Sequence, residues 1–404
     1  MLAVIESHPV QYHAPVYRAV QAQFGIPVAA IYGSDVSVAG YRDKEFGVSF
    51  AWDTDLLAGY ESHFLTRTSD GNRGETAVRA HGAAAILGRL EPRAVMVLGY
   101  GSPFDRDALF AAWRTGVPLI FRGETTDHAV QRDPARAWLR DSALRLLYRG
   151  LSRVLYIGQR SLHHYRRLGV PEQKLLFAPY CVETAAFACD EDARRRLRSA
   201  ARSELGLAET DIALLFSGKI SERKGPDLLV QAVKALPDEL RSRVCVCFLG
   251  DGQMRAQVQS LTEDAPAVRT HFLGFQNQTQ LSRYYHAADL LVLPSRRGET
   301  WGLVVNEALH HGVPCVVSDA VGCAPDLIEP GITGNVFETG SAASLATALV
   351  ESTALVGQAD TRERCRQRVS GFSVTEAARG VAEAYAHVTR GHHVPVARSV
   401  VKPA

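Results

Sequence analysis

The chain has 404 residues, a formal net charge of +2, and 46% hydrophobic and 22% charged residues. This length suffices for two ordinary domains, and the composition excludes a disordered or fibrous protein. The near-neutral charge excludes the overall basic field of a nucleic-acid-binding protein, so we expect no nucleic-acid partner. No stretch approaches the roughly 18 apolar residues of a membrane span, and the N-terminus lacks the basic region of a signal peptide, so a cytoplasmic location is expected.

Short apolar runs, each followed by an amphipathic segment of helix length, fill the first half of the chain. They are LAVIES, IPVAAIYG, AVMVLGY, VPLIFRG, RVLYIG and KLLFAPY. Runs that are apolar throughout, rather than alternating, are typical of strands that helices cover on both faces. This half therefore predicts a doubly wound α/β domain over residues 1–188.

A charged, helix-prone segment separates the two halves. Its basic run of Arg194, Arg195, Arg196 and Arg198 favours a solvated helix face over a binding patch. The strand–helix alternation then resumes with IALLFSG, VCVCFLG, DLLVLPS, PCVVSD and GNVFETG, which predicts a second doubly wound domain over residues 189–372. Residues 373–404 are predicted to form a C-terminal helix that returns toward the first domain, followed by a polar tail.

The cysteines and acidic pairs give little support for a metal. The seven cysteines form no CxxC pair, and small buried apolar side chains in a reducing compartment are the expected explanation. Two DxD strings, Asp53–Asp55 and Asp190–Asp192, could indicate a metal-dependent transferase of another fold, but neither follows a clear buried strand. We therefore expect no metal site.

Ligands of open parallel sheets bind at the carboxyl ends of the strands, so the loops after the strands are the candidate site. In the second half, Gly218, Lys219 and Lys224 follow IALLFS, and the two lysines are placed to meet a diphosphate. Gly250 ends the next strand and lets the backbone approach a ligand closely. A later loop with Gly274 and Phe275 could hold a flat base by backbone hydrogen bonds and apolar contact.

The stretch PSRRGETWGLVVNEALHHG places one glutamate before a helix and another within it, at Glu299 and Glu307. By the helical rise, Glu307 lies about 9 Å further along. The first-turn N–H groups of Gly302, Leu303 and Val304 favour a phosphate, as does the positive end of the helix dipole. A carboxylate accepts two charge-assisted hydrogen bonds from a vicinal diol. The spacing therefore fits a nucleotide sugar, with the sugar at one glutamate and the ribose at the other.

The second half resembles glycosyltransferase family 4 over nearly its whole length. The signatures that carry the resemblance are GKISERKG, FLGDG, FLGFQNQTQLSRYYHAADLLVLPS, and the Glu-x7-Glu segment through GNVF. The resemblance implies the GT-B fold, in which two doubly wound, Rossmann-like domains face a central cleft. It also implies that Lys224, and Lys219 at a position usually held by Arg, bind the donor diphosphate. Glu299 would contact the transferred sugar and Glu307 the ribose.

The same resemblance implies a retaining glycosyltransferase that uses a nucleoside-diphosphate sugar, UDP- or GDP-linked, with no cofactor and no essential metal. A sugar, a lipid-linked saccharide and a small metabolite are all open as acceptors. Lys224→Ala or Glu299→Ala is expected to abolish transfer while leaving the fold intact. Two alternatives remain: a nucleotide-sugar epimerase on the same architecture, and a non-catalytic nucleotide-sugar-binding protein.

The first half resembles the family more loosely. His8, in the loop after the first strand, is the candidate for an N-terminal group at the diphosphate. Many family members carry His-Gly after the strand that corresponds to VPLIF, where this chain has Arg122-Gly123. Arg122, Glu124 and His128 are therefore the candidates on the acceptor side.

The basic, amphipathic stretch RDPARAWLRDSALRLLYRGLSRVLYI admits two interpretations. Its apolar face could dock on an anionic membrane that carries a lipid-linked acceptor, at the inner face of the cell membrane. Packing of that face on the N-terminal sheet, with the arginines in water, is the favoured interpretation.

Overall fold

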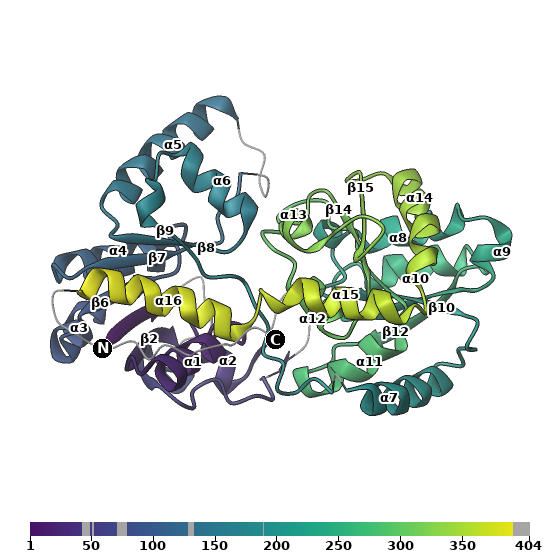
Figure 1. Ribbon diagram of the computed structural model, residues 1–404, viewed down its shortest axis with the longest axis horizontal. Helices are drawn as coiled ribbons and strands as arrows, with labels where there is room; N and C mark the ends of the chain where they lie inside the picture. Colours follow the sequence, from purple (N-terminus) through teal and green to yellow (C-terminus); the bar gives the residue numbers. More distant parts are fainter. Residues whose placement is uncertain (43–48, 51, 71–78, 128–132, 189, 391–404) are drawn as a thin grey trace, which may run out of the picture.

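Two parallel sheets, one in each half of the chain, organise the computed structural model (Figure 1). The structure describes residues 1–42, 49–50, 52–70, 79–127, 133–188 and 190–390. Among them, the first sheet has the strand order β5-β2-β1-β6-β7-β8-β9 and the second β12-β11-β10-β13-β14-β15. All pairings within these two sheets are parallel. In each sheet the order reverses at the first strand, as in doubly wound folds, which confirms the predicted fold class.

The first domain has helices on both faces of its sheet. In β1, Leu2 and Val4 belong to one apolar cluster while Ala3 and Ile5 belong to another, so every residue of the strand is buried. This is why the strands are apolar throughout rather than alternating. The elements are β1 (Leu2–Glu6), α1 (Ala14–Phe24), β2 (Val28–Ser34), α2 (Val36–Ala39), β5 (Glu61–Thr66), η1 (Thr68–Asp70), α3 (Ala83–Leu90), β6 (Ala94–Val97), α4 (Pro103–Arg114), β7 (Leu119–Arg122), α5 (Pro134–Arg149), β8 (Arg153–Tyr156), α6 (Gln159–Arg167), η3 (Glu172–Lys174) and β9 (Leu175–Phe177), with β3 (Tyr41–Arg42) and β4 (Ser49–Phe50) paired apart from the sheet.

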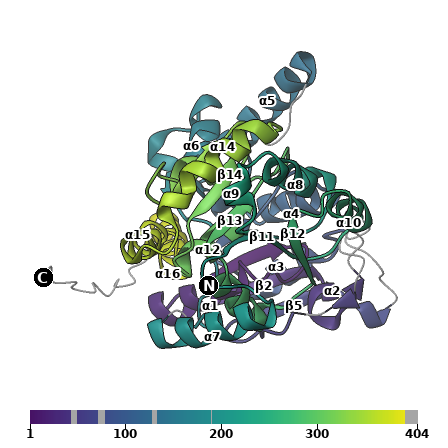
Figure 2. The same ribbon diagram turned by 90° about the vertical axis from the view of Figure 1, so that its right-hand side faces the viewer.

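The second domain repeats the plan. In Figure 2, α8 and α14 lie on one side of β13 and β14, and α12 and α15 on the other. Its elements are α7 (Glu191–Glu204), β10 (Ile212–Ser217), η4 (Glu222–Lys224), α8 (Pro226–Lys234), α9 (Asp238–Arg241), β11 (Val244–Leu249), α10 (Arg255–Glu263), β12 (Arg269–Gly274), η5 (Gln278–Gln280), α11 (Leu281–Ala287), β13 (Leu290–Leu293), α12 (Leu303–His310), β14 (Cys315–Ser318), α13 (Ala324–Leu327), β15 (Gly334–Phe337), α14 (Ala342–Ser352), η6 (Thr353–Leu355) and α15 (Ala359–Ser370). The carboxyl ends of β10, β11, β13 and β14 therefore share one edge of this sheet.

The last helix, α16 (Val374–Thr389), crosses from the second domain and packs on the first (Figure 1). Gly380 makes this packing close, since a Cβ atom there would lie 1.9 Å from the carbonyl oxygen of Phe177. The N-terminal amino group of Met1 also donates to the hydroxyl of Tyr385, at 3.1 Å. These contacts hold the C-terminal helix against β9 and against Met1, which directly precedes β1.

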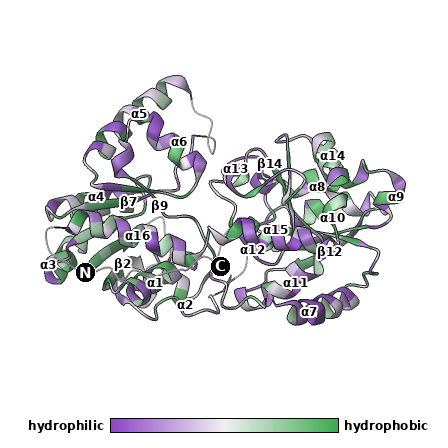
Figure 3. Ribbon diagram, in the orientation of Figure 1, coloured by the Kyte–Doolittle hydropathy of each residue, from purple (hydrophilic) through white to green (hydrophobic). Residues whose placement is uncertain are grey.

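Figure 3 shows hydrophilic residues along the outer helices, α7 among them. Among the helices that the structure describes, none combines the length and the apolar character that a membrane crossing requires.

Candidate functional site

Loops at the carboxyl ends of three strands are joined by backbone hydrogen bonds in the second domain. Gly218 N–H donates to Leu249 O at 2.9 Å, and Gly250 N–H donates to Gly274 O at 2.8 Å. A Cβ atom at Gly250 would lie 2.0 Å from Gly218 O. The close approach expected of Gly250 is therefore made to the neighbouring loop, and the glycines bring Lys219 to the edge of the sheet.

Lys224 and Glu299 form a buried pair, with 9% and 8% of each residue exposed. Lys224 Nζ donates to Glu299 Oε2, and Ser295 Oγ donates to the same oxygen at 2.8 Å. Arg223 Nη1 lies 3.9 Å from it. Burial would raise the pKa of Glu299, but the charge and hydrogen bond of Lys224, together with Arg223, hold this pKa below its usual value. Lys224, predicted to bind the diphosphate, thus contacts the carboxylate predicted to bind the sugar.

The loop that follows β14 holds the segment around Glu299 in place. Gly322 N–H donates to Glu299 O at 3.0 Å, and Cys323 N–H donates to Trp301 O at 2.9 Å. A Cβ atom at Gly322 would lie 1.9 Å from Thr300 O. This backbone support positions Glu299 directly before the first turn of α12.

The turn into α12, where the phosphate site is predicted, is built around a glycine. Gly302 takes the left-handed conformation, with φ 102°, and Leu303 and Val304 open the helix. A Cβ atom at Gly302 would lie 3.0 Å from both Leu293 Cδ2 and Val321 Cγ1. A side chain at this residue would be strained by the positive φ and would crowd Leu293 and Val321, so glycine favours the approach of the helix N-terminus to the strand edge. The positive end of the helix dipole lies there.

Glu307 is also buried, but among the residues that the structure describes it has no paired cation. Only 2% of Glu307 is exposed. Tyr285 OH donates to its Oε2 at 2.6 Å, and Tyr12 OH, from the first domain, donates to its Oε1 at 3.5 Å. Burial raises the pKa of Glu307 to about 7, although both tyrosine hydrogen bonds act in the opposite direction. Neither tyrosine was predicted from the sequence, although Tyr12 stands only four residues after His8.

The first domain brings a second histidine toward the interface. His8 lies after β1, with Nδ1 2.9 Å from Ser7 Oγ. His13 is more deeply buried: its Nδ1 lies 2.5 Å from Glu6 Oε1, and its ring stacks on Tyr180 with centroids 5.8 Å apart. Within the described part of the chain, His13 Nε2 has no hydrogen-bond partner. The sequence held one signal for the Glu6–His13 pair. Glu6 stands at the end of an apolar strand, and His13 stands directly before the helix that follows.

The three acceptor-side candidates have different outcomes. Arg122 is buried; its Nη2 donates to Pro179 O at 3.1 Å, and its guanidinium lies 5.1 Å from the centroid of the Tyr180 ring. Glu124 is exposed, and its Oε2 accepts from Thr300 Oγ1 across the domains at 3.4 Å. His128 lies outside the described residues. Glu124 is therefore the candidate that the structure places beside the Glu299 segment, while Arg122 packs inside the first domain.

The two domains touch directly beside this segment. A Cβ atom at Gly158 would lie 2.3 Å from the ring of Trp301. Trp301 Nε1 donates to Asn306 Oδ1 at 2.8 Å, and Asn306 Nδ2 donates to Tyr180 O at 3.3 Å. The start of α12 is thus held from both domains.

The first aspartate of each DxD string has a structural partner. Asp53 Oδ2 accepts from Thr279 Oγ1 across the domains at 2.6 Å. Asp190 Oδ1 accepts from Ala193 N–H at 2.7 Å and caps α7. In the ranges that the structure describes, no group of three or more His, Cys, Asp or Glu side chains is arranged to hold a metal ion.

Comparisons with known sequences point to one family. Residues 198–369 match the family model described as glycosyl transferases group 1. D-inositol 3-phosphate glycosyltransferase 1 of Catenulispora acidiphila is 34% identical over 197 residues, which cover 45% of each chain. The D-inositol 3-phosphate glycosyltransferase of Streptomyces coelicolor is 37% identical over 161 residues, or 38% of this chain and 35% of that protein. The chain therefore spans less than half the length of these curated relatives.

Solved structures resemble the whole chain in fold. A glycosyltransferase from Rickettsia africae superposes with a TM-score of 0.71 at 14% identity, over 97% of this chain and 99% of that one. Anabaena Alr3699/HepE, in complex with UDP and glucose, superposes with a TM-score of 0.69 at 17% identity, over 96% and 100% of the two chains. At these identities the likeness concerns the fold, and it extends to both domains.

Proposed function

We propose that this chain, whose residues 198–369 match the group 1 glycosyl transferases, transfers a sugar from a nucleoside-diphosphate sugar to an acceptor hydroxyl. The observation that carries the proposal is the buried Lys224–Glu299 pair directly before the N-terminus of α12, at the carboxyl edge of the second sheet. An ionised carboxylate held beside a phosphate-binding helix end suits a hydroxyl-rich sugar joined to a diphosphate. The names of the relatives favour transfer over epimerisation or binding alone.

The donor, UDP- or GDP-linked, lies along this edge in our proposal. Lys219 and the first turn of α12 bind the diphosphate, and Glu299 accepts hydrogen bonds from the transferred sugar. Gly274 and Phe275 contact the base. Glu307 accepts from the ribose hydroxyls once Tyr12, which now occupies Oε1, moves aside with the first domain.

Catalysis in this proposal is mainly electrostatic. The departing nucleoside diphosphate gains negative charge as the glycosidic bond breaks, and Lys219, Lys224 and the α12 N-terminus stabilise that charge. The acceptor hydroxyl attacks from the same face, its proton passing to a phosphate oxygen of the leaving group. No protein carboxylate forms a covalent intermediate, no metal or cofactor takes part, and the anomeric configuration is retained.

Nucleotide binding and product stereochemistry test this function. A thermal-shift panel of UDP-, GDP- and ADP-sugars should raise the melting temperature with one base preferred, because a ligand of the native state stabilises it by about 2.7 kcal/mol at a hundredfold excess over Kd. The Glu299→Gln variant should lose most of the sugar-dependent part of the shift. A flat panel would overturn the proposal, and an inverted product anomer by NMR would overturn its retaining mechanism.

We also propose that α5 contacts an anionic membrane, which would place a lipid-linked acceptor near the site. Trp138, Leu139 and Leu146 are 69%, 66% and 71% exposed, and exposed Arg145 lies among them. The favoured sequence interpretation, packing of the apolar face on the sheet, therefore holds for only part of the helix, Leu144 included. Exposed Trp and Leu beside Arg suit the interface of an anionic bilayer.

Vesicle flotation tests the membrane contact. The chain should float with phosphatidylglycerol vesicles and less with neutral phosphatidylcholine vesicles, since part of the attraction is electrostatic. Trp138→Ser with Leu146→Ser should abolish flotation. Trp113→Ser on α4, where the side chain is equally exposed at 69%, is the matched control and should float normally. Equal loss in the control would contradict a role specific to α5.

A further inference from the structure

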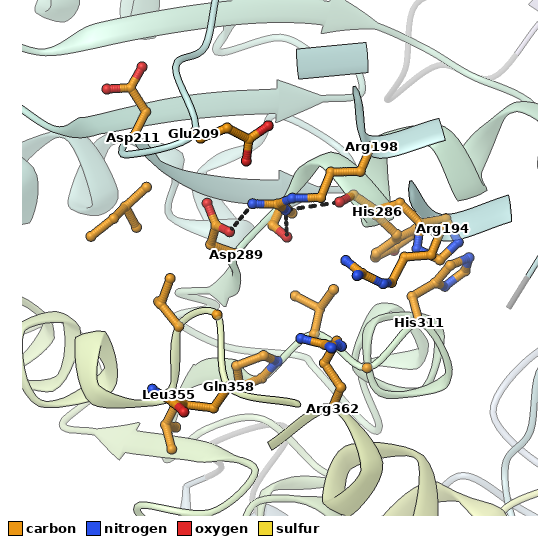
Figure 4. A pocket seen from close by; sticks show the side chains of 18 of the residues that line it. Arg194, Arg198, Glu209, Asp211, His286, Asp289, His311, Leu355, Gln358 and Arg362 are labelled. Atoms are coloured by element: carbon orange, nitrogen blue, oxygen red, sulfur yellow. Dashed lines mark hydrogen bonds and ion pairs between the residues drawn. The ribbon is translucent and has the colours of Figure 1, made fainter. Parts of the chain in front are cut away.

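A cavity of about 380 Å³ opens at the amino ends of the second sheet, on the edge away from the donor site (Figure 4). Its walls include Ile212 at the start of β10, Asp289 before β13, Pro314 before β14 and Gln358 before α15. The strands between the two edges have four to six residues. At about 3.3 Å per residue, the cavity lies roughly 10–20 Å from the loops that carry Lys219 and Glu299.

The cavity is lined by arginines from separate elements. Arg194 and Arg198 come from α7, Arg362 from α15, and Arg243 precedes β11. Figure 4 shows Arg194 and Arg362 reaching toward one another from opposite walls. The side chains of Arg194 and Arg198 are only 18% and 20% exposed. The prediction of a solvated face for the basic run is therefore wrong for these two arginines, because α7 turns them toward the domain.

Three arginines share one carboxylate at this wall. Glu191 Oε2 lies 2.7 Å from Arg194 Nε, and Glu191 Oε1 lies 3.7 Å from Arg362 Nε and 3.5 Å from Arg366 Nη2. Burial and the charges of Arg194, Arg366 and Arg198 lower the pKa of Arg362, with Glu191 acting against them. Like charges held together at low exposure repel one another unless an anion joins them.

Asp289 and Asp211, two of the three acidic side chains that line the cavity, are already paired with arginines. Asp289 accepts from Arg198 at 2.7 Å and from Arg202 at 3.0 Å, and Asp211 pairs with Arg269 at 2.7 Å. Counting these partners, the described residues in and around the cavity include seven arginines and four carboxylates: Arg194, Arg198, Arg202, Arg243, Arg269, Arg362 and Arg366, with Glu191, Glu209, Asp211 and Asp289. The surplus of positive charge lies on the side of Arg194 and Arg362.

A buried histidine on the cavity wall has an unused nitrogen. His286 is 3% exposed, and its Nε2 lies 2.7 Å from Ala188 O. In the part of the chain that the structure describes, its Nδ1 has no hydrogen-bond partner, and the same holds for Nε and Nη2 of Arg366. The twelve-residue helix α15 also begins at this wall, at Gln358, without a side-chain cap. Because His286 Nε2 donates to a carbonyl oxygen, Nδ1 of the uncharged ring is an acceptor. The donors around the cavity come from its lining arginines and from the first turn of α15.

One wall of the cavity reaches the donor site. Tyr285 lines the cavity, and its hydroxyl donates to Glu307 Oε2 at 2.6 Å. Its ring stacks on His311, also a lining residue, with centroids 5.0 Å apart, and His311 Nδ1 lies 2.7 Å from Glu307 O. A ligand that shifts Tyr285 or His311 would therefore shift Glu307 as well.

We propose that this cavity is an effector site for a small phosphate monoester, and that its occupation changes the affinity for the donor nucleotide through Tyr285 and Glu307. Its volume is that of a site for a small metabolite, and the guanidinium groups of Arg194 and Arg362 match phosphate oxygens in pairs. The effector half of the proposal rests on the proposed function, whereas the phosphate site does not.

Calorimetry without nucleotide tests the phosphate site, with glucose 6-phosphate and inorganic phosphate as probes. The wild-type chain should bind glucose 6-phosphate, and Arg194→Gln with Arg362→Gln should weaken binding at least about tenfold. Arg364→Gln, on the same helix but 50% exposed and paired with Asp360, is the matched control and should bind normally. The double variant should melt no lower than the wild type in phosphate-free buffer, because it loses repelling charges. No binding by the wild type, or full binding by the double variant, would overturn the site.

A second titration tests the effector role separately from the phosphate site. The affinity for UDP should change about fivefold or more when glucose 6-phosphate saturates the cavity, and Tyr285→Phe should remove that change. An unaltered UDP affinity would overturn the effector role. Failure of UDP to bind in the absence of any phosphate ester would count against the proposed function instead, and would leave the cavity result standing.

Discussion

Glu299 and Glu307 lie on one short stretch of the chain and are both buried, yet their surroundings shift their pKa values in opposite directions. Lys224 and Arg223 hold the pKa of Glu299 below its usual value in spite of burial. Around Glu307 there are two tyrosine hydroxyls and no paired cation among the described residues, and burial raises its pKa to about 7. Two carboxyl groups with similar burial thus have pKa shifts of opposite direction, because only one of them has a cation beside it.

The largest effect should come from Lys224→Ala. Transfer should fall at least about a thousandfold, because a cation next to the leaving group is lost. The free energy of unfolding should fall by about 3 kcal/mol, because buried Glu299 loses its closest cation and keeps only Arg223, at 3.9 Å. The sequence predicts an intact fold for this variant, and the buried pair adds an expected loss of stability. Turnover of a sugar nucleotide and urea denaturation measure the two effects.

A paired variant is the control for Lys224→Ala. Lys224→Met combined with Glu299→Gln removes both charges and should recover most of the stability, while transfer stays absent. Wild-type turnover in either variant would refute the role given to Lys224. Equal instability in both variants would show that packing, rather than charge, holds this pair.

Glu307→Gln should stabilise the folded chain at pH 8, whereas Lys224→Ala should destabilise it. The pKa of folded Glu307 is about 7, above its usual 4.5, so the folded state binds this proton more tightly than the unfolded state. The stability gained from that proton is fully present below pH 4.5 and is lost as the pH rises to about 7. At pH 8 the ionised side chain costs roughly 3 kcal/mol, which Gln would recover. Urea denaturation should therefore show stabilisation at pH 8 and little change at pH 4.5.

Glu299→Gln is the matched control for this variant, since it should destabilise the chain at pH 8. The same Glu307→Gln change should also weaken UDP binding, because an amide accepts less strongly from a diol than a carboxylate does. A loss of stability at pH 8 in Glu307→Gln would contradict the contrast between the two glutamates.

The smallest effect is expected at Tyr12. Tyr12→Phe removes a hydroxyl that occupies Glu307 Oε1 from the first domain, so UDP should bind about twofold more tightly. The estimate follows from the roughly 0.5 kcal/mol of a weak hydrogen bond. Calorimetry with UDP measures it, and Tyr385→Phe, which loses a hydrogen bond far from the site, should leave the affinity unchanged. Weaker UDP binding would mean that Tyr12 assists the ribose rather than competing with it.

The sequence alone was enough to predict the fold class and the resemblance to a glycosyltransferase family. The structure confirms the fold class, and a glycosyl transferase family model matches residues 198–369. Strands that are buried on both faces must be apolar throughout, and the helices that cover them must be amphipathic. The spacing of apolar residues along the chain therefore predicts the fold class. The sequence also predicted two parts of the candidate site: the glycines after β10 and β11, and the stretch from Glu299 to Glu307. The residues of each part lie close together along the chain.

The tertiary structure decided which side chains meet. Lys224 and Glu299 are 75 residues apart, and Tyr12 and Glu307 are 295 apart. Such contacts depend on how elements that are far apart in the sequence pack together. The spacing of residues within one element does not reveal that packing. For the same reason, the sequence pointed to His8 and not to buried His13. Charge states followed from these contacts, since burial and the nearest cation set the pKa of each carboxylate only after the chain had folded.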